Sequence, residues 1–396
     1  MLGLTSLLTE EPAFGDGLRY VEGARRSRTG VRPGAGPVVV WEITRTCNLR
    51  CQHCYANAGP GRFEGEMTHE EGRAFIDDLA AFKVPVLLVS GGEPLSRPDT
   101  LDLMQYAVSK GIRVTLSTNG TLITPEVARE LKRIGVGYVG ISIDGTPDVH
   151  DRVRRRAGAF ARAMRGVRNC AEAGIRVGIR FTIHKDNVHT LPFVLQLLED
   201  EPFDRACFYH LVYSGRGAAE QDVTPEVTRK VVGQLIDQVE DWHQRGIDKE
   251  ILTVDNHADG AYLYLYMREK DPARAEAIRR RLRMNGGNRS GIAICHVDYQ
   301  GNVHPDQFTQ HHTFGNVRER SFGEIWSDES HDLLKGLRDR EERLHGRCKD
   351  CVLYDVCGGN FRTRAEAVYG DFWAPDPACY LTDEEIHDQM LRGESA

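Results

Sequence analysis

The stretch VVVWEITRTCNLRCQHCY, residues 38–55, joins a short apolar run to a loop that holds three cysteines. The run begins at Val38 and is rich in β-branched residues, which predicts a buried strand. Directly after it come Cys47, Cys51 and Cys54, separated by three residues and then by two. Three thiols in one loop at the end of a strand indicate a metal or redox centre.

Five further apolar runs follow, and amphipathic, helix-like stretches lie between them. The runs are VPVLLVSGG (84–92), IRVTLSTNG (112–120), VGYVGISIDG (136–145), IRVGIRFTI (175–183) and RACFYHLVY (205–213). Continuous apolar strands that alternate with helices predict an α/β fold with a parallel sheet. Six such units favour a partial (β/α)6 barrel of the TIM type, with the ligand site at the carboxyl ends of the strands.

The pattern changes along the chain and indicates four segments. Residues 1–37, which end in RTGVRPGAGP, are predicted to be an irregular N-terminal extension, and residues 38–217 to be the barrel core. Residues 218–290 are predicted to be a helical continuation that ends in the linker-like turn NGGNRSG (285–291). A smaller C-terminal domain, 291–396, is expected to begin with a β-hairpin around Tyr299–Gly301.

Composition narrows the class of protein. The chain has 396 residues, 40% of them hydrophobic, which allows a large core, and its net charge of −7 argues against a nucleic-acid binder. No apolar run is long enough to span a bilayer, and the first residues lack the features of a secretory signal. We therefore expect no nucleic-acid or membrane partner and a cytoplasmic location, where clustered cysteines bind metal rather than form disulfides.

Zinc is the first interpretation to weigh for the three-cysteine loop. A structural zinc site requires four ligands, and the only local candidate for the fourth, His53, is adjacent to Cys54 and awkwardly placed. A [4Fe–4S] cluster with three cysteine ligands instead leaves one iron open to a small molecule.

A second cysteine set lies near the C-terminus, where Cys348, Cys351 and Cys357 are followed by Cys379. Four cysteines suit zinc as well as an iron–sulfur cluster, so their spacing alone leaves both interpretations open. The isolated Cys170 and Cys207 are expected to be small buried residues.

The CxxxCxxC loop after a first strand, the following Tyr55 and the later GGEP together resemble the radical S-adenosylmethionine (SAM) superfamily. The resemblance implies that the open iron chelates SAM and that Glu93 of GGEP accepts a hydrogen bond from the amino group of SAM. It further implies that Asn119 and Ser142 hold the ribose or methionine moiety, that Tyr55 contacts adenine through its backbone, and that Arg180 binds the SAM carboxylate.

The chemistry of that family is implied in the same way. An electron from the reduced cluster cleaves SAM into methionine and a 5′-deoxyadenosyl radical, and the radical abstracts a hydrogen atom from the substrate. The reductant is expected to be of the flavodoxin or ferredoxin type. No side chain is assigned as catalytic, since the cofactors carry the chemistry.

The spacing CxxCx5C with a later cysteine resembles the auxiliary-cluster motif of SPASM/twitch C-terminal domains. This resemblance implies a second [4Fe–4S] cluster held by Cys348, Cys351, Cys357 and Cys379, with Cys295 as an alternative fourth ligand. Full SPASM domains carry further cysteines, but Asp306 and Phe361 stand at the corresponding positions here. We therefore expect one auxiliary cluster rather than two.

Three further stretches, FYHLVYSGRG (208–217), DNHADG (255–260) and GNVHPDQF (301–308), resemble radical SAM enzymes that remodel tetrapyrrole side chains, above all haem d1 biosynthesis enzymes of the NirJ type. The implied reaction removes propionate side chains from 12,18-didecarboxysirohaem. The alternatives are a related haem-pathway side-chain decarboxylase, a peptide-modifying SPASM enzyme, and a non-enzymatic cluster or zinc protein. The acidic balance and GGEP disfavour the last of these.

An iron tetrapyrrole presents carboxylates and an iron atom, which arginine and histidine can bind. We expect His210, Arg216 and His257 to face the substrate, with one or two of the arginines in 152–156. The other arginines of RVRRRAGAFARAMRGVR (152–168) are expected to form a solvated helix face.

Overall fold

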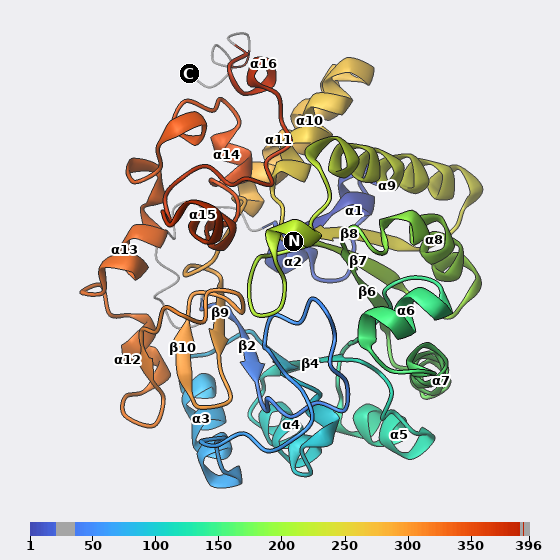
Figure 1. Ribbon diagram of the computed structural model, residues 1–396, viewed down its shortest axis with the longest axis vertical. Helices are drawn as coiled ribbons and strands as arrows, with labels where there is room; N and C mark the ends of the chain where they lie inside the picture. Colours follow the sequence, from blue (N-terminus) through green and yellow to red (C-terminus); the bar gives the residue numbers. More distant parts are fainter. Residues whose placement is uncertain (21–35, 389–390, 392–396) are drawn as a thin grey trace.

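The computed structural model describes residues 1–20, 36–388 and 391, and its strands form one open, curved sheet with helices around it (Figure 1). Within these residues the sheet has eleven strands in the order β1-β8-β7-β6-β5-β4-β3-β2-β9-β10-β11. The strands are β1 (Leu2–Gly3), β2 (Val38–Glu42), β3 (Val86–Ser90), β4 (Arg113–Thr118), β5 (Val139–Ser142), β6 (Val177–Ile183), β7 (Arg205–His210), β8 (Glu250–Val254), β9 (Ile294–Val297), β10 (Asn302–His304) and β11 (Gly315–Asn316).

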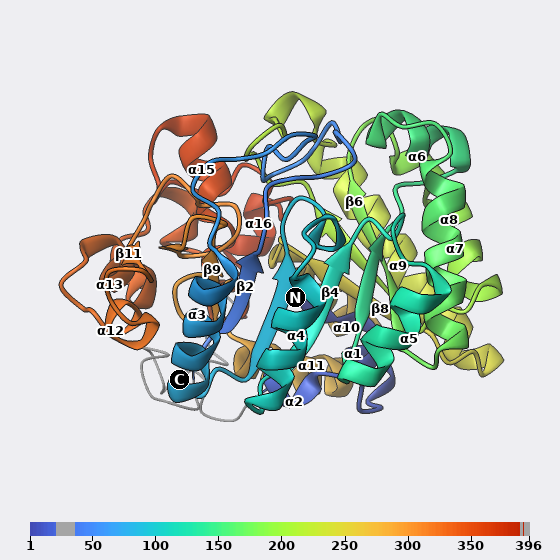
Figure 2. The same cartoon turned by 90° about the horizontal axis from the view of Figure 1, so that it is seen from below.

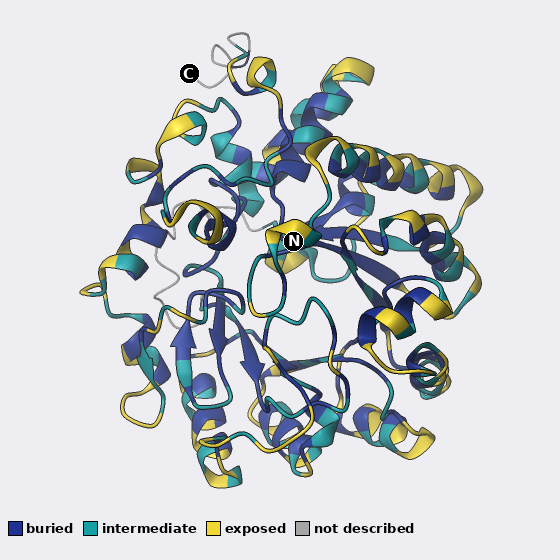
Figure 3. Cartoon of the chain, in the orientation of Figure 1, coloured by how far each residue is buried: buried dark blue, intermediate teal, exposed yellow. Residues whose placement is uncertain are grey.

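Strands β2 to β7 correspond to the six predicted strands, and each pairs in parallel with the next. Val39 of β2, for example, lies opposite Leu87 of β3. Most residues of these strands are buried, as the dark blue strands in Figure 3 show, which explains their continuous apolar sequence. Because the sheet has two edges and does not close, the predicted α/β partial barrel is confirmed.

Helices return the chain between consecutive parallel strands and cover the outside of the sheet (Figure 2). The α-helices are α1 (Leu4–Thr9), α2 (Asp16–Arg19), α3 (His69–Ala81), α4 (Thr100–Ser109), α5 (Pro125–Ile134), α6 (Pro147–Arg154), α7 (Ala159–Glu172), α8 (Leu191–Asp200), α9 (Pro225–Arg245), α10 (Ala258–Lys270), α11 (Pro272–Asn285), α12 (Phe322–Trp326), α13 (Asp332–Arg338), α14 (Tyr354–Cys357), α15 (Arg362–Tyr369) and α16 (Asp383–Ile386). No described helix has the length and apolar character that crossing a membrane requires.

Several helices begin at residues whose side chains satisfy the free backbone N–H groups of the first turn. The Thr68 hydroxyl accepts the N–H of Glu71, and the Glu71 carboxylate accepts the N–H of Thr68, which forms a capping box at α3. Thr124 and Thr224 cap α5 and α9, and each is followed by a proline at the first helical position. These local signals define where the crossover helices start.

The parallel sheet continues beyond the six predicted strands. Strand β8 pairs in parallel with β7, and β1 pairs antiparallel with β8, with Leu2 opposite Thr253. Residues 2–19, part of the predicted N-terminal extension, thus form β1, α1 and α2. Most of RTGVRPGAGP lies in 21–35, outside the described residues.

The C-terminal part of the chain is attached to the other side of the barrel. Strand β9 pairs in parallel with β2, and β10 pairs antiparallel with β9, with Val303 opposite Val297, so the predicted hairpin is confirmed. The proposed boundary at 285–291 falls between the end of α11 and the start of β9. This pairing brings the C-terminal part next to β2, the strand that leads into the cysteine loop.

Candidate functional site

One cavity lies at the carboxyl ends of the parallel strands, with an empty volume of about 1090 Å³ that includes its opening to solvent. Its walls come from the cysteine loop after β2, the ends of β3 to β7, Asp255 after β8, and the pair Gln307–Phe308 from the C-terminal part. This cavity thus lies where a parallel sheet predicts a ligand site.

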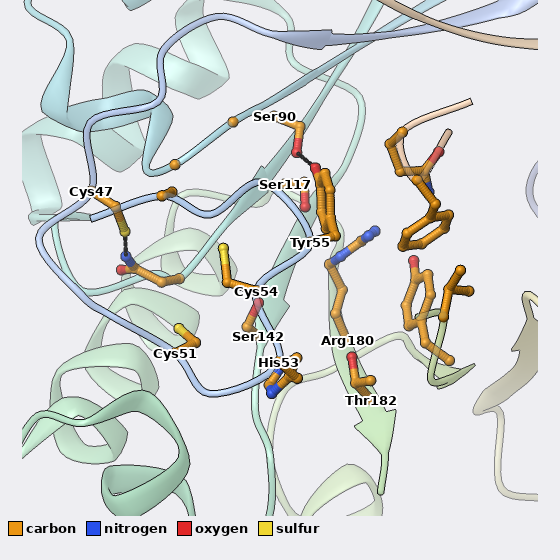
Figure 4. Close-up of a pocket in the computed structure, with 18 of the residues that line it drawn as sticks. Cys47, Cys51, His53, Cys54, Tyr55, Ser90, Ser117, Ser142, Arg180 and Thr182 are labelled. Carbon is orange, nitrogen blue, oxygen red and sulfur yellow. Dashed lines mark hydrogen bonds between the residues drawn. The ribbon is translucent and has the colours of Figure 1, made fainter. Parts of the chain in front are cut away.

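The thiols of Cys47, Cys51 and Cys54 turn toward a shared space at one end of this cavity (Figure 4). Cys47 and Cys51 are buried, and the N–H of Leu49 donates to the Cys47 sulfur over 3.4 Å. Burial, assisted by the nearby Glu93 carboxylate, raises the pKa of Cys47 to about 12. Burial therefore disfavours a bare thiolate at this position, and a bound metal would compensate its charge.

Within the described chain, only His311, His312 and Glu366 bring three candidate ligand atoms within 4.8 Å of one another. Neither cysteine set meets this criterion, so neither forms a preassembled tetrahedral zinc site, in which Zn–S bonds of about 2.3 Å would place the sulfurs about 3.8 Å apart.

Two glycines of the GGEP motif let the cysteine loop approach β3 closely. A Cβ on Gly92 would lie 2.3 Å from the Thr46 carbonyl oxygen, and one on Gly91, where φ is +141°, would lie 2.4 Å from that of Thr44. Instead, the Gly92 N–H donates to the Thr44 carbonyl over 2.7 Å. Any larger residue would push the loop away from the strand end.

Glu93 is fully buried and is not among the cavity-lining residues. Its carboxylate accepts hydrogen bonds from the Thr118 hydroxyl at 2.7 Å and from the Asn119 N–H at 2.8 Å. Asn119 itself lines the cavity, and its side-chain amide donates to Asn48 in the cysteine loop over 2.8 Å. In this structure Glu93 therefore fixes the end of β4, and Asn119 joins that end to the cysteine loop.

Arg216 lines the cavity, but its guanidinium binds the cysteine loop. The guanidinium donates to the carbonyls of Cys51 over 2.7 Å and Ala58 over 2.9 Å. The backbone N–H of Arg216 donates to the Cys54 carbonyl over 2.9 Å. A Cβ on the preceding Gly215 would lie 2.2 Å from the Tyr55 carbonyl oxygen. Arg216, predicted to bind substrate, thus clamps the loop.

A buried ion pair lies behind Cys51. Arg154, in the last turn of α6, pairs with the fully buried Asp144 at 2.5 Å and donates to the Cys51 sulfur over 3.4 Å. Burial alone would raise the pKa of Asp144, but the Arg154 guanidinium holds it below its usual range. Burial lowers the pKa of His53 to about 3, so this neighbour is neutral at physiological pH.

The remaining walls are aromatic and carry one guanidinium that forms no hydrogen bond or ion pair with the described residues. Tyr55 packs edge-on against Phe308 at 5.3 Å, and its hydroxyl hydrogen-bonds to Ser90 at 3.2 Å. Arg180 lies over the Tyr209 ring at 4.5 Å and has no hydrogen bond or ion pair within the described residues. Together with Ser142 at the end of β5, these groups can bind an anionic molecule with a flat face (Figure 4).

The two histidines predicted to face the substrate differ in position. His210 lines the cavity, and its Nε2 contacts the Asp259 carboxylate at 2.9 Å. His257 is buried outside the cavity lining, with its Nε2 3.5 Å from the amino group of Met1. Asp255, which was not predicted, lines the cavity with a positive φ of 68° and an unpartnered Oδ2. A strained backbone at a cavity wall marks Asp255 as a functional candidate.

Asp255 gives a pH-dependent prediction. Burial raises its pKa from 3.8 to about 6, against the attraction of the Met1 amino group. Its contribution to stability is therefore complete below about pH 4 and is lost as the pH rises through about 6, a cost of about 3 kcal/mol. Asp255→Asn, which suits a positive φ, should thus gain stability over wild type between about pH 5 and pH 8. Anaerobic thermal unfolding across this range measures the difference, and a pH-independent difference would contradict the assignment.

The four C-terminal cysteines form the second candidate metal centre. Burial, and then the neighbouring thiols of Cys379, Cys348 and Cys351, raise the pKa of Cys357 well above its usual value. The turn NGGNRSG (285–291) packs closely against Cys357. A Cβ on Gly287, where φ is +68°, would lie 2.1 Å from the Cys357 carbonyl oxygen, so the close approach depends on glycine at this position.

Cys295 has different contacts from these four cysteines. It is fully buried in β9, paired with Val39 of β2, and its thiol donates to the His304 carbonyl over 3.5 Å. After burial, the groups that act most on its pKa are Arg338 and Asp306.

Comparison with known proteins identifies the class. Residues 41–198 match the radical SAM superfamily, and residues 290–352 match the iron–sulfur cluster-binding domain termed SPASM. The Fe-coproporphyrin III synthase of Methanosarcina barkeri is 49% identical over 396 residues, covering 98% of this chain and 99% of that protein. The pre-heme d1 synthase of Dinoroseobacter shibae is 42% identical over 353 residues, covering 88% of this chain and 87% of that protein.

A solved structure supports the fold alone. Streptococcus suis SuiB bound to its precursor peptide SuiA has a TM-score of 0.71 and 17% identity, covering 90% of this chain and 78% of SuiB. The chain therefore belongs to the radical SAM superfamily and carries a SPASM domain. It is a radical SAM enzyme, and its cofactors are [4Fe–4S] clusters and SAM.

Proposed function

We propose that this enzyme removes carboxylate-bearing side chains from a sirohaem-derived iron tetrapyrrole, 12,18-didecarboxysirohaem, to give Fe-coproporphyrin III. The observation that carries the proposal is the 49% identity to an Fe-coproporphyrin III synthase from end to end of both chains. A coproporphyrin retains its propionates, so this reaction removes acetate side chains.

The residues have separate roles in this proposal. Cys47, Cys51 and Cys54 hold the cluster that binds SAM, and Cys348, Cys351, Cys357 and Cys379 hold the auxiliary cluster. Cys379 is preferred to Cys295 as the fourth ligand because its thiol acts on the pKa of Cys357, whereas Cys295 bonds to a backbone carbonyl. A reduced cluster held by these cysteines would supply the electron for reductive cleavage of SAM and so the radical chemistry that starts with hydrogen abstraction.

The protein's own contribution is binding and exclusion of water. Arg180 binds a carboxylate, because its guanidinium lines the cavity over the Tyr209 ring and has no hydrogen-bond or ion-pair partner among the described residues. Tyr55, Tyr209 and Phe308 provide apolar surface for the edge of a macrocycle. Asn119 and Ser142 hold polar groups of SAM at the ends of β4 and β5. Glu93 acts through Asn119, whose position it fixes.

The route to haem d1 is the second candidate, favoured by the 42% identity to a pre-heme d1 synthase. It would remove propionates from the same tetrapyrrole on the way to oxo groups. Both candidates share the cavity, the cofactors and a one-electron reductant of the flavodoxin or ferredoxin type.

Anaerobic turnover with 12,18-didecarboxysirohaem, SAM and dithionite, followed by mass spectrometry, tests the proposal. Loss of the acetate side chains is the expected result, whereas loss of propionates supports the second candidate, because a propionate has one methylene more. Iron coproporphyrin serves as a control substrate that should remain unchanged. SAM cleavage without any change in the tetrapyrrole, or without a shift of its absorbance on binding, would contradict the substrate class and favour a peptide substrate.

A further inference from the structure

Four exposed arginines lie in the cysteine loop and at the end of α6, which contacts that loop. We call Arg50, Arg152, Arg155 and Arg156 the arginine patch. Arg50 stands between Cys47 and Cys51, and the other three stand at the end of α6 and directly after it.

Two contacts bring the α6 end against the cysteine loop. The N–H of Gln52 donates to the Val153 carbonyl over 3.0 Å, and the Arg154 guanidinium donates to the Cys51 sulfur over 3.4 Å. Each patch residue is within two positions of one of these four contacting residues. The patch therefore lies on exposed surface beside the loop that would hold the proposed SAM-binding cluster.

No patch residue has an ion-pair partner within the part of the chain that the structure describes. Exposed arginines elsewhere do pair, as Arg168 does with Glu201 at 2.6 Å and Arg133 with Glu130 at 2.5 Å. The whole chain carries a net charge of −7, so composition does not explain this local excess of positive charge. Neighbouring like charges repel each other, and an acidic partner would relieve that repulsion.

We propose that the arginine patch docks an acidic one-electron carrier protein of the flavodoxin type. The inference rests on the proposed function, since only a cluster that must be reduced needs such a partner. In the docked complex the carrier loses one electron and the [4Fe–4S]2+ centre gains it, with no atom transferred. Charge attraction steers the carrier to the exposed surface beside the cysteine loop.

The test compares two sets of charge reversals in the reconstituted enzyme. Arg155→Glu/Arg156→Glu changes the patch, and Arg113→Glu/Arg280→Glu changes two exposed arginines at the start of β4 and on α11 by the same net charge. The Kd for a purified flavodoxin, measured by fluorescence anisotropy at low salt, should rise about tenfold only in the patch variant. Flavodoxin-driven deoxyadenosine formation should fall similarly, and dithionite-driven formation should stay unchanged.

The milder Arg155→Gln/Arg156→Gln variant should give an intermediate Kd, and iron content checks that each variant folds. Equal flavodoxin binding by the patch and control variants overturns the proposal. A patch variant with normal flavodoxin binding but weaker tetrapyrrole binding also overturns it and assigns the patch to substrate carboxylates. Failure of the proposed function would be seen separately, as wild-type enzyme that cannot cleave SAM with dithionite.

Discussion

Replacing Cys54 by alanine should abolish deoxyadenosine formation and halve the iron content of the reconstituted protein, from about eight to about four atoms per chain. Cys54 shares the end of the cavity with Cys47 and Cys51. With one of three ligands removed, the remaining two thiols cannot hold a cluster with a single open iron. Anaerobic iron analysis and chromatography of the SAM products measure both effects.

Cys170→Ala is the matched control, because Cys170 is fully buried in α7 and belongs to neither cysteine set. It should keep its iron and its SAM cleavage and lose only the packing of one sulfur atom. The reciprocal variant Cys351→Ala should also lose about half of the iron yet still release deoxyadenosine. If Cys54→Ala cleaved SAM, or if Cys351→Ala failed to do so, the assignment of the two centres would be wrong.

The six strands from β2 to β7 could be predicted because most of their residues are buried and each strand reads as an apolar run beside a helix. Strand β8 was missed because its five residues follow the long helix α9 without an apolar run of comparable length. Strand β1 has only two residues, too few for any periodic signal, and exists through its pairing with β8. Long-range pairing of this kind lies beyond local pattern.

The cysteine sets could be singled out by their spacing along the chain, and their ligand roles stay predictions. What each arginine contacts could not be predicted, because it depends on where the guanidinium points. Arg216 was predicted to bind substrate but holds backbone carbonyls of the cysteine loop. Arg154 lies in an arginine-rich run, and its side chain is buried while those of the neighbouring arginines are exposed. Only its position on α6 distinguishes it from them. The sequence signal that could have identified the ion-pair partner of Arg154 was the aspartate of SIDG, Asp144.

Replacing Arg154 by glutamine should cost about 3 kcal/mol of unfolding free energy, because it leaves the charge of Asp144 buried and unpaired. Asp144 has no exposed surface, and neither of its carboxylate oxygens has a hydrogen-bond partner besides the ion pair. The pair shares its guanidinium with the Cys51 sulfur, so the variant should also alter the electron paramagnetic resonance spectrum of the reduced cluster. Anaerobic urea denaturation at neutral pH and that spectrum are the two measurements.

Arg168→Gln provides the control for this prediction, because it also breaks an arginine–carboxylate pair, with Glu201, but on the exposed face of α7. Solvent screens that pair, so its loss should cost less than about 1 kcal/mol. Adding Asp144→Asn to Arg154→Gln removes the stranded charge and should restore most of the lost stability, although the donor to Cys51 stays absent. Equal costs for the Arg154 and Arg168 variants, or no recovery in the double variant, would mean that burial of the Asp144 charge does not govern stability here.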